Sequence, residues 1–445
     1  MMVWKKGIIL VLQLYLLRSC GAILTDITNK REFGCSWQGG STMGHLTCSC
    51  RSDKEWIIDS NIPPYDTASI DFKNCRRITF KPNSISFLTN LRNLRLENIT
   101  ELVLEDYSLA WKGYKKDLYT ELDPSISSLK IEVVDSGITT IGSHAFSGIV
   151  GEIVLDGATV SDTSSFAFSS LTQTLLVQIK NTVFHNVQLQ TFKKFTTERF
   201  ELINVTANVL PSRMMSDVYV TDTFLIKDCK FDTVRSSAFV IKSPRSLQIL
   251  NSDIRQLSAE GLVVTEAQNV LIKDNRIEYV NDGAFYGIRP GKNLLLKLEG
   301  NTFTHITRDS LQLPEGTVYL DRLQLNKSCD CYEIDHNLDK QYYASIHCLQ
   351  DGQYMTVQEF KTGYCSVLSS NTNLIVILSV VGVLAILAVT VLVFFLRRHF
   401  RSDKYGSHKQ SKKGQLSLIV PDGRTYRETE LHVIVEKTDL LTTDL

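Results

Sequence analysis

The segment VLIKDNRIEYVNDGAF, residues 270–285, contains the pattern that decides the fold. Apolar and polar residues alternate over 270–273, which is typical of a short strand with one face toward a core. Asn275 is expected to turn the chain, and the apolar pair Ile277 and Val280 returns to the core, whose far side is filled by Ala284-Phe285. One such unit cannot bury its own faces, so the segment predicts one coil of a repeat.

The same spacing of apolar positions recurs along much of the chain. The steps between repeats are mostly 22 to 26 residues, and a fixed period of this length predicts a solenoid of stacked coils. The one wide step, from Leu94 to Ile131, contains residues 111–116, which we interpret as an insertion that loops out of a coil. The repeats start near Ile70, Leu94, Ile131, Ile153, Val177, Phe200, Phe224, Leu247, Val270 and Leu296.

The spacing L-x-L-x-x-N-x-I-x-x-V-x-x-x-A-F over residues 270–285 resembles the extracellular leucine-rich repeat family. The resemblance covers roughly residues 35–365. It implies an α/β repeat solenoid with short parallel strands stacked in one sheet and a disulfide cap at each end. Most coils lack the asparagine, and Val205 or Ala158 stands in its place. A right-handed parallel β-helix has coils of similar length and is the alternative fold.

Nine cysteines remain when Cys20, in the signal segment, is set aside. Eight form two groups of four near the ends of the repeats, and the spacing leaves three disulfide connectivities for each group. Neither group has the ligand spacing of a zinc site, so no metal is expected. The ninth, Cys229, falls inside a repeat and is expected to be a buried free thiol. The leucine-rich repeat resemblance implies the pairs Cys35–Cys50, Cys48–Cys75, Cys329–Cys348 and Cys331–Cys365.

Two apolar stretches predict the compartment. At the N-terminus, Lys5-Lys6 precede an apolar run and small residues, which is typical of a secretory signal cleaved near Ala22. Leu374–Leu396 is 23 residues without a charge, enough to cross a hydrocarbon core of ~30 Å as a helix. Basic residues follow from Arg397 onward, and they predict a type I single-pass protein of the plasma membrane with an extracellular N-terminus.

These features divide the chain into seven expected segments. They are a signal peptide at 1–22, an N-terminal cysteine-containing cap and first strand at 23–76, the repeat solenoid at 77–318, a C-terminal cysteine cap at 319–366, a juxtamembrane linker at 367–373, the membrane helix at 374–396 and a cytoplasmic tail at 397–445.

The outward strand positions of the repeats are the expected ligand surface. In a leucine-rich repeat protein such positions line the concave face, and an ordinary solvated face is the alternative interpretation. The candidate ligand face consists of Lys227, Asp228, Gln248, Asn251, Lys273, Asp274, Lys297 and Glu299. Three N-x-[ST] sequons, at Asn98, Asn204 and Asn326, are expected to carry glycans.

The sequence offers little support for catalysis. A β-helix that cleaves polysaccharide needs clustered acidic residues that hold calcium and abstract a proton, and we find no such cluster and no catalytic motif. We therefore expect no enzyme activity and no cofactor. The 48 basic residues balance 48 acidic ones, which also argues against nucleic acid as a partner.

The tail is expected to recruit partners. Glu436, Leu440 and Leu441 resemble an acidic dileucine signal for a clathrin adaptor, and Thr443 with the terminal Leu445 fits a PDZ scaffold. We expect the protein to mediate cell adhesion or cell–cell recognition through an extracellular protein ligand or a receptor on the opposing cell, homophilic or heterophilic. The alternatives are a ligand-binding receptor or co-receptor that is internalised through its tail and, more remotely, a carbohydrate-active β-helix protein.

Overall fold

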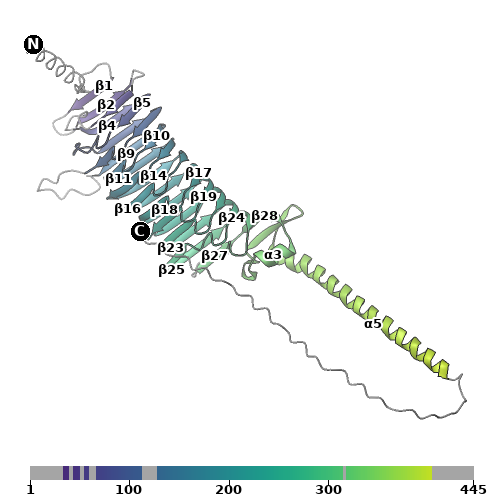
Figure 1. Cartoon of the computed structure of the whole chain (residues 1–445). Helices are drawn as coiled ribbons and strands as arrows, with labels where there is room; N and C mark the ends of the chain where they lie inside the picture. The colour runs from purple at the N-terminus through teal and green to yellow at the C-terminus, as the bar shows by residue number, and fades with distance from the viewer. Residues whose placement is uncertain are drawn as a thin grey trace, which may run out of the picture. The chain divides into compact units, whose positions relative to one another are not determined.

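A computed structural model describes residues 34–39, 44–50, 55–59, 67–112, 128–313 and 317–402. Over these ranges the chain up to residue 370 winds into a parallel β-solenoid of about 12 turns (Figure 1). Residues 371–445 belong to a separate unit, and its described residues, 371–402, are part of the long helix α5 (Ser366–Ser402). The β-helix alternative is therefore the fold of the repeats.

The first of two sheets in the described ranges, sheet A, has 16 strands. All of its neighbouring strands are parallel except β1 and β2, which are antiparallel. Its strands are β1 (Cys35–Gly39), β2 (Gly44–Ser49), β4 (Thr67–Lys73), β6 (Asn93–Glu97), β8 (Leu109–Trp111), β9 (Leu129–Val134), β11 (Phe146–Asp156), β13 (Phe168–Thr172), β14 (Thr174–Lys180), β16 (Phe192–Ile203), β18 (Met215–Lys227), β20 (Phe239–Lys242), β21 (Ser246–Leu250), β23 (Leu262–Lys273), β25 (Ile288–Glu299) and β27 (Thr317–Asp321).

The second, sheet B, has 14 strands and receives one strand from each coil. Its neighbours are parallel except β29 and β30, which are antiparallel. Its strands are β3 (Glu55–Ile58), β5 (Arg77–Phe80), β7 (Glu101–Leu104), β10 (Gly137–Ile141), β12 (Thr159–Thr163), β15 (Val183–Asn186), β17 (Thr206–Leu210), β19 (Lys230–Val234), β22 (Asp253–Leu257), β24 (Arg276–Val280), β26 (Thr302–Ile306), β28 (Leu323–Ser328), β29 (Ile346–Gln350) and β30 (Gln353–Thr356).

The second sheet shows why the leucine-rich repeat interpretation is wrong. That fold has one sheet of short strands, whereas here the return segment of each coil is also a strand. Within residues 270–285, the segment Arg276–Val280 pairs in parallel with β22 and β26. Because this return segment is itself a hydrogen-bonded strand, the coil closes through a second sheet.

The core is made of side chains that stack from coil to coil. Phe146, Phe168 and Phe192 lie in register on β11, β13 and β16, with ring centroids 4.5 and 4.7 Å apart. Each such aromatic pair adds about 0.5–1.5 kcal/mol beyond the burial of its area. Stability therefore comes from contacts between successive coils, as the sequence repeat predicts.

The turn from sheet A to sheet B is made by a column of residues with positive φ. Asp228, Asn251 and Asp274 have φ of 55°, 47° and 54°. Asn251 Nδ2 donates to Asp228 Oδ1 at 2.6 Å, which links successive coils along the turn. Asn and Asp tolerate this left-handed conformation better than most residues. The sequence assigned the turn to the next residue in each coil, such as Asn275, which is in fact 1% exposed.

The expected insertion is only partly outside the coil. Trp111 ends β8, is buried, and donates from its indole Nε1 to the carbonyl oxygen of Leu88 at 2.9 Å. The interpretation that the whole of 111–116 loops out is therefore wrong at Trp111, because this side chain belongs to the core. Residues 113–127 lie outside the described ranges.

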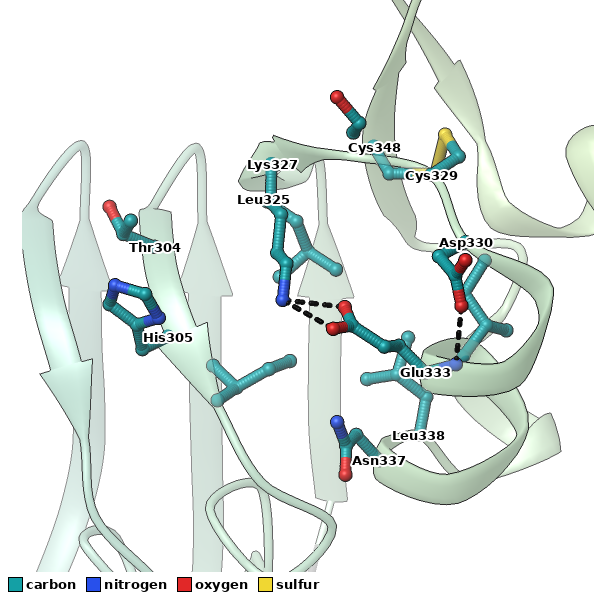
Figure 2. Close-up of a pocket in the computed structure, with 13 residues that line it drawn as sticks. Thr304, His305, Leu325, Lys327, Cys329, Asp330, Glu333, Asn337, Leu338 and Cys348 are labelled. Carbon is teal, nitrogen blue, oxygen red and sulfur yellow. Dashed lines mark hydrogen bonds and ion pairs between the residues drawn. A yellow bond between two sulfur atoms is a disulfide. The ribbon is translucent and has the colours of Figure 1, made fainter.

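The C-terminal cap closes the last coil with helix α3 (Cys331–Asn337), and α4 (Val357–Phe360) follows β30. Asp330 caps α3 by accepting from the backbone N–H groups of Tyr332 and Glu333, each at 2.9 Å. A cavity of about 60 Å³ remains between the last coil and α3 (Figure 2). Lys327 Nζ lies 2.6 Å from Glu333 Oε2 at this cavity. We interpret the cavity as the joint between coil and cap, because the buried Ile334 of α3 forms part of its wall.

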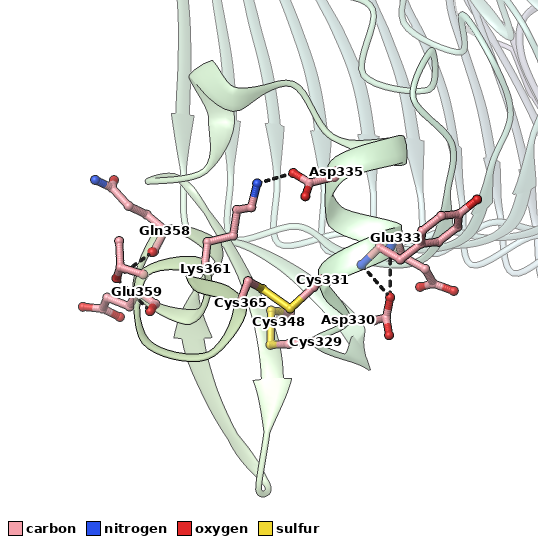
Figure 3. Close-up of a disulfide and its surroundings, with 12 residues drawn as sticks. Cys329, Asp330, Cys331, Glu333, Asp335, Cys348, Gln358, Glu359, Lys361 and Cys365 are labelled. Carbon is pink, nitrogen blue, oxygen red and sulfur yellow. Dashed lines mark hydrogen bonds and ion pairs between the residues drawn. A yellow bond between two sulfur atoms is a disulfide. The ribbon is translucent and has the colours of Figure 1, made fainter. Parts of the chain in front are cut away.

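The cap cysteines form the two pairs that the resemblance implied. Cys329 is bonded to Cys348 and Cys331 to Cys365 (Figure 3). Together they join the start of α3 to β29 and to the residue that precedes α5. Lys361 forms an ion pair with Asp335 of α3, which adds a polar contact across the same cap (Figure 3).

The N-terminal cysteines are paired differently from expectation. Cys35 is bonded to Cys48 and Cys50 to Cys75, so the implied pairs Cys35–Cys50 and Cys48–Cys75 are wrong. The reason is strand register. Cys35 lies directly opposite Cys48 in the antiparallel pair of β1 and β2, and Cys50 and Cys75 follow the neighbouring parallel strands β2 and β4.

Candidate recognition surfaces

The predicted ligand residues lie together on sheet A, on a sheet face rather than in the concavity of a leucine-rich repeat array. Five of them point outward from the second half of the coil strands: Lys227, Gln248, Lys273, Lys297 and Glu299. The other three, Asp228, Asn251 and Asp274, belong to the adjoining turn column. The predicted face is thus a flat strand surface and its edge.

Ion pairs hold the charged end of this face. Glu299 Oε1 accepts from Lys273 Nζ and from Arg322 Nη2, both at 2.9 Å, and Arg322 Nε also contacts Asp321 at 3.1 Å. The hydrogen bond from Lys273 is the main cause that lowers the pKa of Glu299. These side chains come from three successive coils, so the stacking of the coils fixes the charge pattern.

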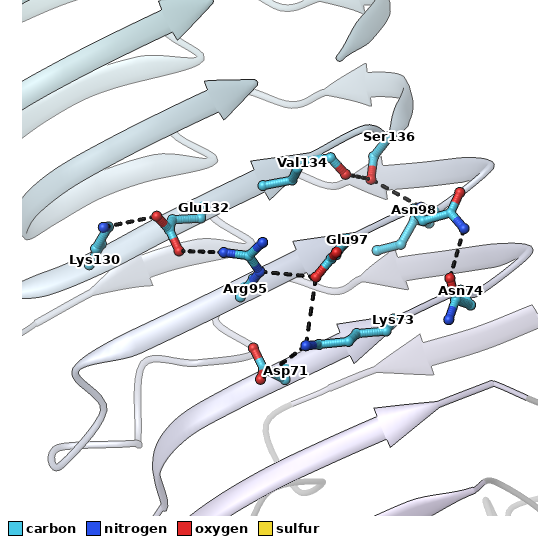
Figure 4. Close-up of polar contacts among 11 residues, drawn as sticks. Asp71, Lys73, Asn74, Arg95, Glu97, Asn98, Lys130, Glu132, Val134 and Ser136 are labelled. Carbon is cyan, nitrogen blue, oxygen red and sulfur yellow. Dashed lines mark hydrogen bonds and ion pairs between the residues drawn. The ribbon is translucent and has the colours of Figure 1, made fainter. Parts of the chain in front are cut away.

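A longer chain of ion pairs covers the N-terminal part of the same face (Figure 4). Arg95 lies at its centre, 3.1 Å from Glu97 and 3.3 Å from Glu132, and its hydrogen bond is the main cause that lowers the pKa of Glu97. Single exposed pairs contribute little to stability, but a connected row holds side chains in defined positions. The row runs through Asp71, Lys73, Glu97, Arg95, Glu132, Lys130 and Glu152.

Apolar side chains also point outward from sheet A, and the sequence analysis missed them as a set. One lies on each of nine successive coils, at one of three neighbouring outward positions of the strand. Tyr319 is 52% exposed, Val154 is only 9% exposed, and the others are partly exposed. Their neighbours in the strand point into the core, so their outward direction follows from the alternation along each strand. We call this set the outer apolar row: Val134, Val154, Leu176, Ile203, Leu225, Leu250, Leu271, Leu295 and Tyr319.

The outer face of sheet B carries a compact group of charges that the sequence analysis also missed. Six charged side chains line an open groove of about 350 Å³, with Phe231 among the groove residues. The only ion pair among these six joins Arg255 to Asp232, in a two-pronged contact that includes Nη2 to Oδ2 at 2.8 Å. The charged residues are Lys230, Asp232, Asp253, Arg255, Arg276 and Glu278.

Five carboxyl groups of the described coils and cap have clearly shifted pKa values. Each one whose pKa is clearly shifted is shifted down, and the first cause is a hydrogen bond from a neighbouring Lys or Arg: Glu97, Asp217, Asp232, Glu299 and Asp335. A general acid needs the opposite shift. Over the described ranges, no group of three or more His, Cys, Asp or Glu side chains is placed to hold a metal ion.

The three sequons are on the surface. Asn98 and Asn204 belong to the turn column, where their Nδ2 atoms donate to Asn74 and Asn181 of the preceding coils at 2.7 and 2.9 Å. Asn326 is exposed on β28 of sheet B. Glycan addition at these sites stays a prediction.

The apolar helix near the C-terminus can cross a membrane by its length and composition. Ile375–Arg398 is 24 residues long with a mean hydropathy of 3.1, and its most apolar part is not buried. The predicted signal peptide and the tail motifs at Glu436, Leu440, Leu441, Thr443 and Leu445 lie outside the described residues. Orientation and compartment therefore stay predictions.

These observations define a disulfide-capped parallel β-solenoid with ordered surface columns. In agreement, the family model described as "right handed beta helix region" matches residues 217–359, about a third of the chain. No leucine-rich repeat family is found, which is the second finding against that resemblance. No curated protein matches this sequence.

Proposed function

We propose that this protein is a type I, plasma-membrane-anchored recognition molecule whose solenoid binds an extracellular protein and mediates cell adhesion. The ectodomain acts as a rigid support, because each coil is hydrogen-bonded to the next along two sheets. The helix Ile375–Arg398 is the proposed anchor. The basic residues that follow it support a cytoplasmic tail.

The observation that supports protein binding most is the outer apolar row. Apolar side chains at outward strand positions are costly on a face that meets only water. Here nine successive coils each carry one, beside charged residues such as Lys273 and Lys297. Apolar groups ringed by charged and polar ones are typical of the contact area of a protein–protein interface.

The proposal is non-enzymatic. The five carboxyl groups with shifted pKa values are all held ionised by basic neighbours, which suits fixed surface charge. Recognition uses such charges to select a partner and to speed its approach.

The test is a binding assay on living cells with the full-length chain. Cells that express it are mixed with cells that express it and with cells that do not, and aggregation is scored. We expect aggregation with expressing cells, which is homophilic adhesion, or with cells that carry another ligand. Aggregation in neither mixture at normal surface levels would contradict the proposal.

A variant on the outer apolar row localises the contact. Leu250→Lys with Leu271→Glu changes two partly exposed side chains without entering the core. We expect normal surface display and at least tenfold fewer aggregates. The matched control is Thr139→Lys with Thr159→Glu, which places the same charges at exposed positions of sheet B and should aggregate as the wild type does.

A further inference from the structure

The charges on sheet B form two columns of alternating sign. Lys230, Asp253 and Arg276 are aligned on β19, β22 and β24 and form column 1, with signs plus, minus, plus. Column 2 lies two residues further along the same strands and has signs minus, plus, minus: Asp232, Arg255 and Glu278. We call these six residues the charge patch.

Most of the patch charges form no ion pair within the described part of the chain. Arg255 is paired with Asp232 and also interacts electrostatically with Glu278. The four charged groups without an ion pair there are Lys230, Asp253, Arg276 and Glu278. Four charges of both signs that stand beside one open groove without an ion pair of their own point to a partner with the complementary pattern.

A second copy of this chain has the complementary pattern. Consider two copies with their sheet B faces together and a two-fold axis parallel to the solenoid, midway between the columns. The rotation puts column 1 of each copy opposite column 2 of the other, at the same coil. Lys230 then faces Asp232 of the second copy, Asp253 faces Arg255, and Arg276 faces Glu278. All six charges meet the opposite sign.

The antiparallel arrangement does not achieve this. If the two-fold axis lies along the middle strand, each column faces itself in reverse order. Lys230 then faces Arg276, Asp253 faces Asp253, and Asp232 faces Glu278, so every contact is between like charges. If one copy of the antiparallel pair is shifted along the solenoid by one coil, four charges of each copy lie opposite the other sign. Arg276 and Glu278 then lie opposite uncharged positions. The pattern therefore favours solenoids that point the same way.

From this we infer that two copies of the chain pair through sheet B in a parallel, face-to-face dimer within one membrane. The contact is independent of the proposed ligand face, which is on sheet A. Packed sheets are about 10 Å apart, a gap that opposed Lys–Asp and Arg–Glu pairs span. In line with the two columns, the flanking coils carry short neutral side chains: Thr206, Asn208, Thr302 and Thr304. Beside them lie the stacked rings of Tyr279 and His305, which would stand at the edge of the contact.

Anchoring in a membrane supports this contact. Surface ion pairs are individually weak and are screened by salt. Two chains held in one membrane with the same orientation have a high effective concentration, so weak contacts become sufficient. Asn326, on β28, lies on the same sheet two coils beyond Glu278, so a glycan there stands at the edge of the contact.

The test is a charge swap between columns in the full-length chain. One variant reverses column 1 (Lys230→Glu, Asp253→Lys, Arg276→Glu), and the other reverses column 2 (Asp232→Lys, Arg255→Glu, Glu278→Lys). Each keeps opposite charges at 232 and 255, so the pair within the chain is preserved. Within either variant both columns have the same signs, and the dimer would oppose like charges. Between the two variants every contact is again complementary.

Two differently tagged copies are co-expressed in one cell, crosslinked at the surface and captured through one tag. We expect capture of the wild type, at least fivefold less capture of either variant alone, and recovery when the two variants are co-expressed. Copies on separate cells should not be captured together. Each arm is repeated with Asn326→Gln, so that a glycan does not mask the contact.

Three results would overturn the inference. One is no capture of the wild type with or without the sequon. Another is undiminished capture of the single variants. The third is no recovery in the mixture while both variants reach the surface. The outer apolar row variant Leu250→Lys with Leu271→Glu separates the two proposals, because it should lose ligand binding and keep capture within one membrane.

Discussion

Lys273 Nζ lies 2.9 Å from Glu299 Oε1, which joins β23 to β25 across two successive coils. Both side chains are on the outer face of sheet A, so their contact belongs to the surface and not to the core. The next residue, Asp274, turns the chain with φ of 54°. The candidate ligand face therefore combines fixed charges with a fixed backbone turn.

Reversing Lys273 and Asp274 together should weaken ligand binding about tenfold and leave surface display unchanged. The Lys273→Glu change places a second carboxylate beside Glu299 and removes a positive charge from the face. Exposed charge pairs contribute little to folding, so the loss should appear in binding to partner cells. The measurement is aggregation at equal surface levels.

The matched control exchanges the two partners. Lys273→Glu with Glu299→Lys keeps the ion pair between these two coils but inverts its direction on the face. Because Glu299 also accepts from Arg322, the exchange includes Arg322→Glu, which keeps that second pair. If only the pair within the chain matters, this variant binds normally. If the ligand recognises which charge stands at which position, the exchanged variant binds as weakly as the variant with Lys273 and Asp274 reversed. Unchanged affinity in both variants would remove this face from the proposal.

The period, the core positions and the membrane helix could be predicted from the sequence because each depends on a local pattern. The apolar positions of residues 270–285 recur in the neighbouring coils, and the inward columns follow from them. The prediction of a leucine-rich repeat fold was wrong for a physical reason. Asn275 is buried and donates from Nδ2 to the carbonyl oxygen of Ile249 in the preceding coil. A buried asparagine of this kind fits a leucine-rich repeat as well as a β-helix, so it did not distinguish the two folds.

The signal of the second sheet was in the return segment, and it was short. Arg276 and Glu278 lie on either side of the buried Ile277, which is the alternation of a strand, but the next buried residue is Val280, three positions further on. Because that segment was interpreted only as a return to the core, its outward charges were not considered. The charge patch on sheet B was therefore missed. The outward residues of sheet A were identified, although the fold assigned to them was wrong.

Removing the buried amide of Asn275 should destabilise the solenoid. Its Nδ2 donates to the carbonyl oxygen of Ile249 at 2.8 Å, and its Oδ1 accepts from the backbone N–H of Ser252 at 2.8 Å. Asn275→Ala leaves both backbone groups buried without these partners. At ~1–3 kcal/mol for each unsatisfied group, the cost of leaving two is about 2–6 kcal/mol. A lower thermal midpoint of unfolding checks this.

The control for this prediction is Asn208→Ala, which removes an amide from an exposed position of β17. It should move the unfolding midpoint by much less, since surface substitutions usually change stability by no more than ~0.5 kcal/mol. Asn275 Nδ2 also donates to Oδ1 of the buried Asn301 in the next coil, at 3.0 Å. Equal shifts for the two variants would mean that these buried amides do not support the coils.

The N-terminal disulfides should be found as Cys35–Cys48 and Cys50–Cys75. The antiparallel register of β1 and β2 puts Cys35 opposite Cys48, so the nearest thiols join. Proteolysis without reduction, followed by mass spectrometry, identifies the linked peptides. A peptide that joins Cys48 to Cys75 would restore the pairing of the leucine-rich repeat resemblance and contradict the register.

The free thiol of Cys229 should make stability fall at alkaline pH. Burial is the main cause that raises its pKa from 9.0 to about 11, so the folded chain keeps its proton over a range where the unfolded chain loses it. Stability falls with rising pH wherever the folded state binds more protons. The contribution of Cys229 is thus complete below pH 9 and is lost as the pH approaches 11.

Cys229→Ala isolates this effect from the other groups that titrate in the same range. The thermal midpoint of the wild type should decline more steeply between pH 9 and 11 than that of the variant. The same burial predicts that an alkylating reagent at pH 8 modifies Cys229 only after unfolding, because the thiolate is the reactive form. Parallel pH profiles for the two chains, or rapid alkylation of the folded wild type, would contradict the buried position of this thiol between the coils.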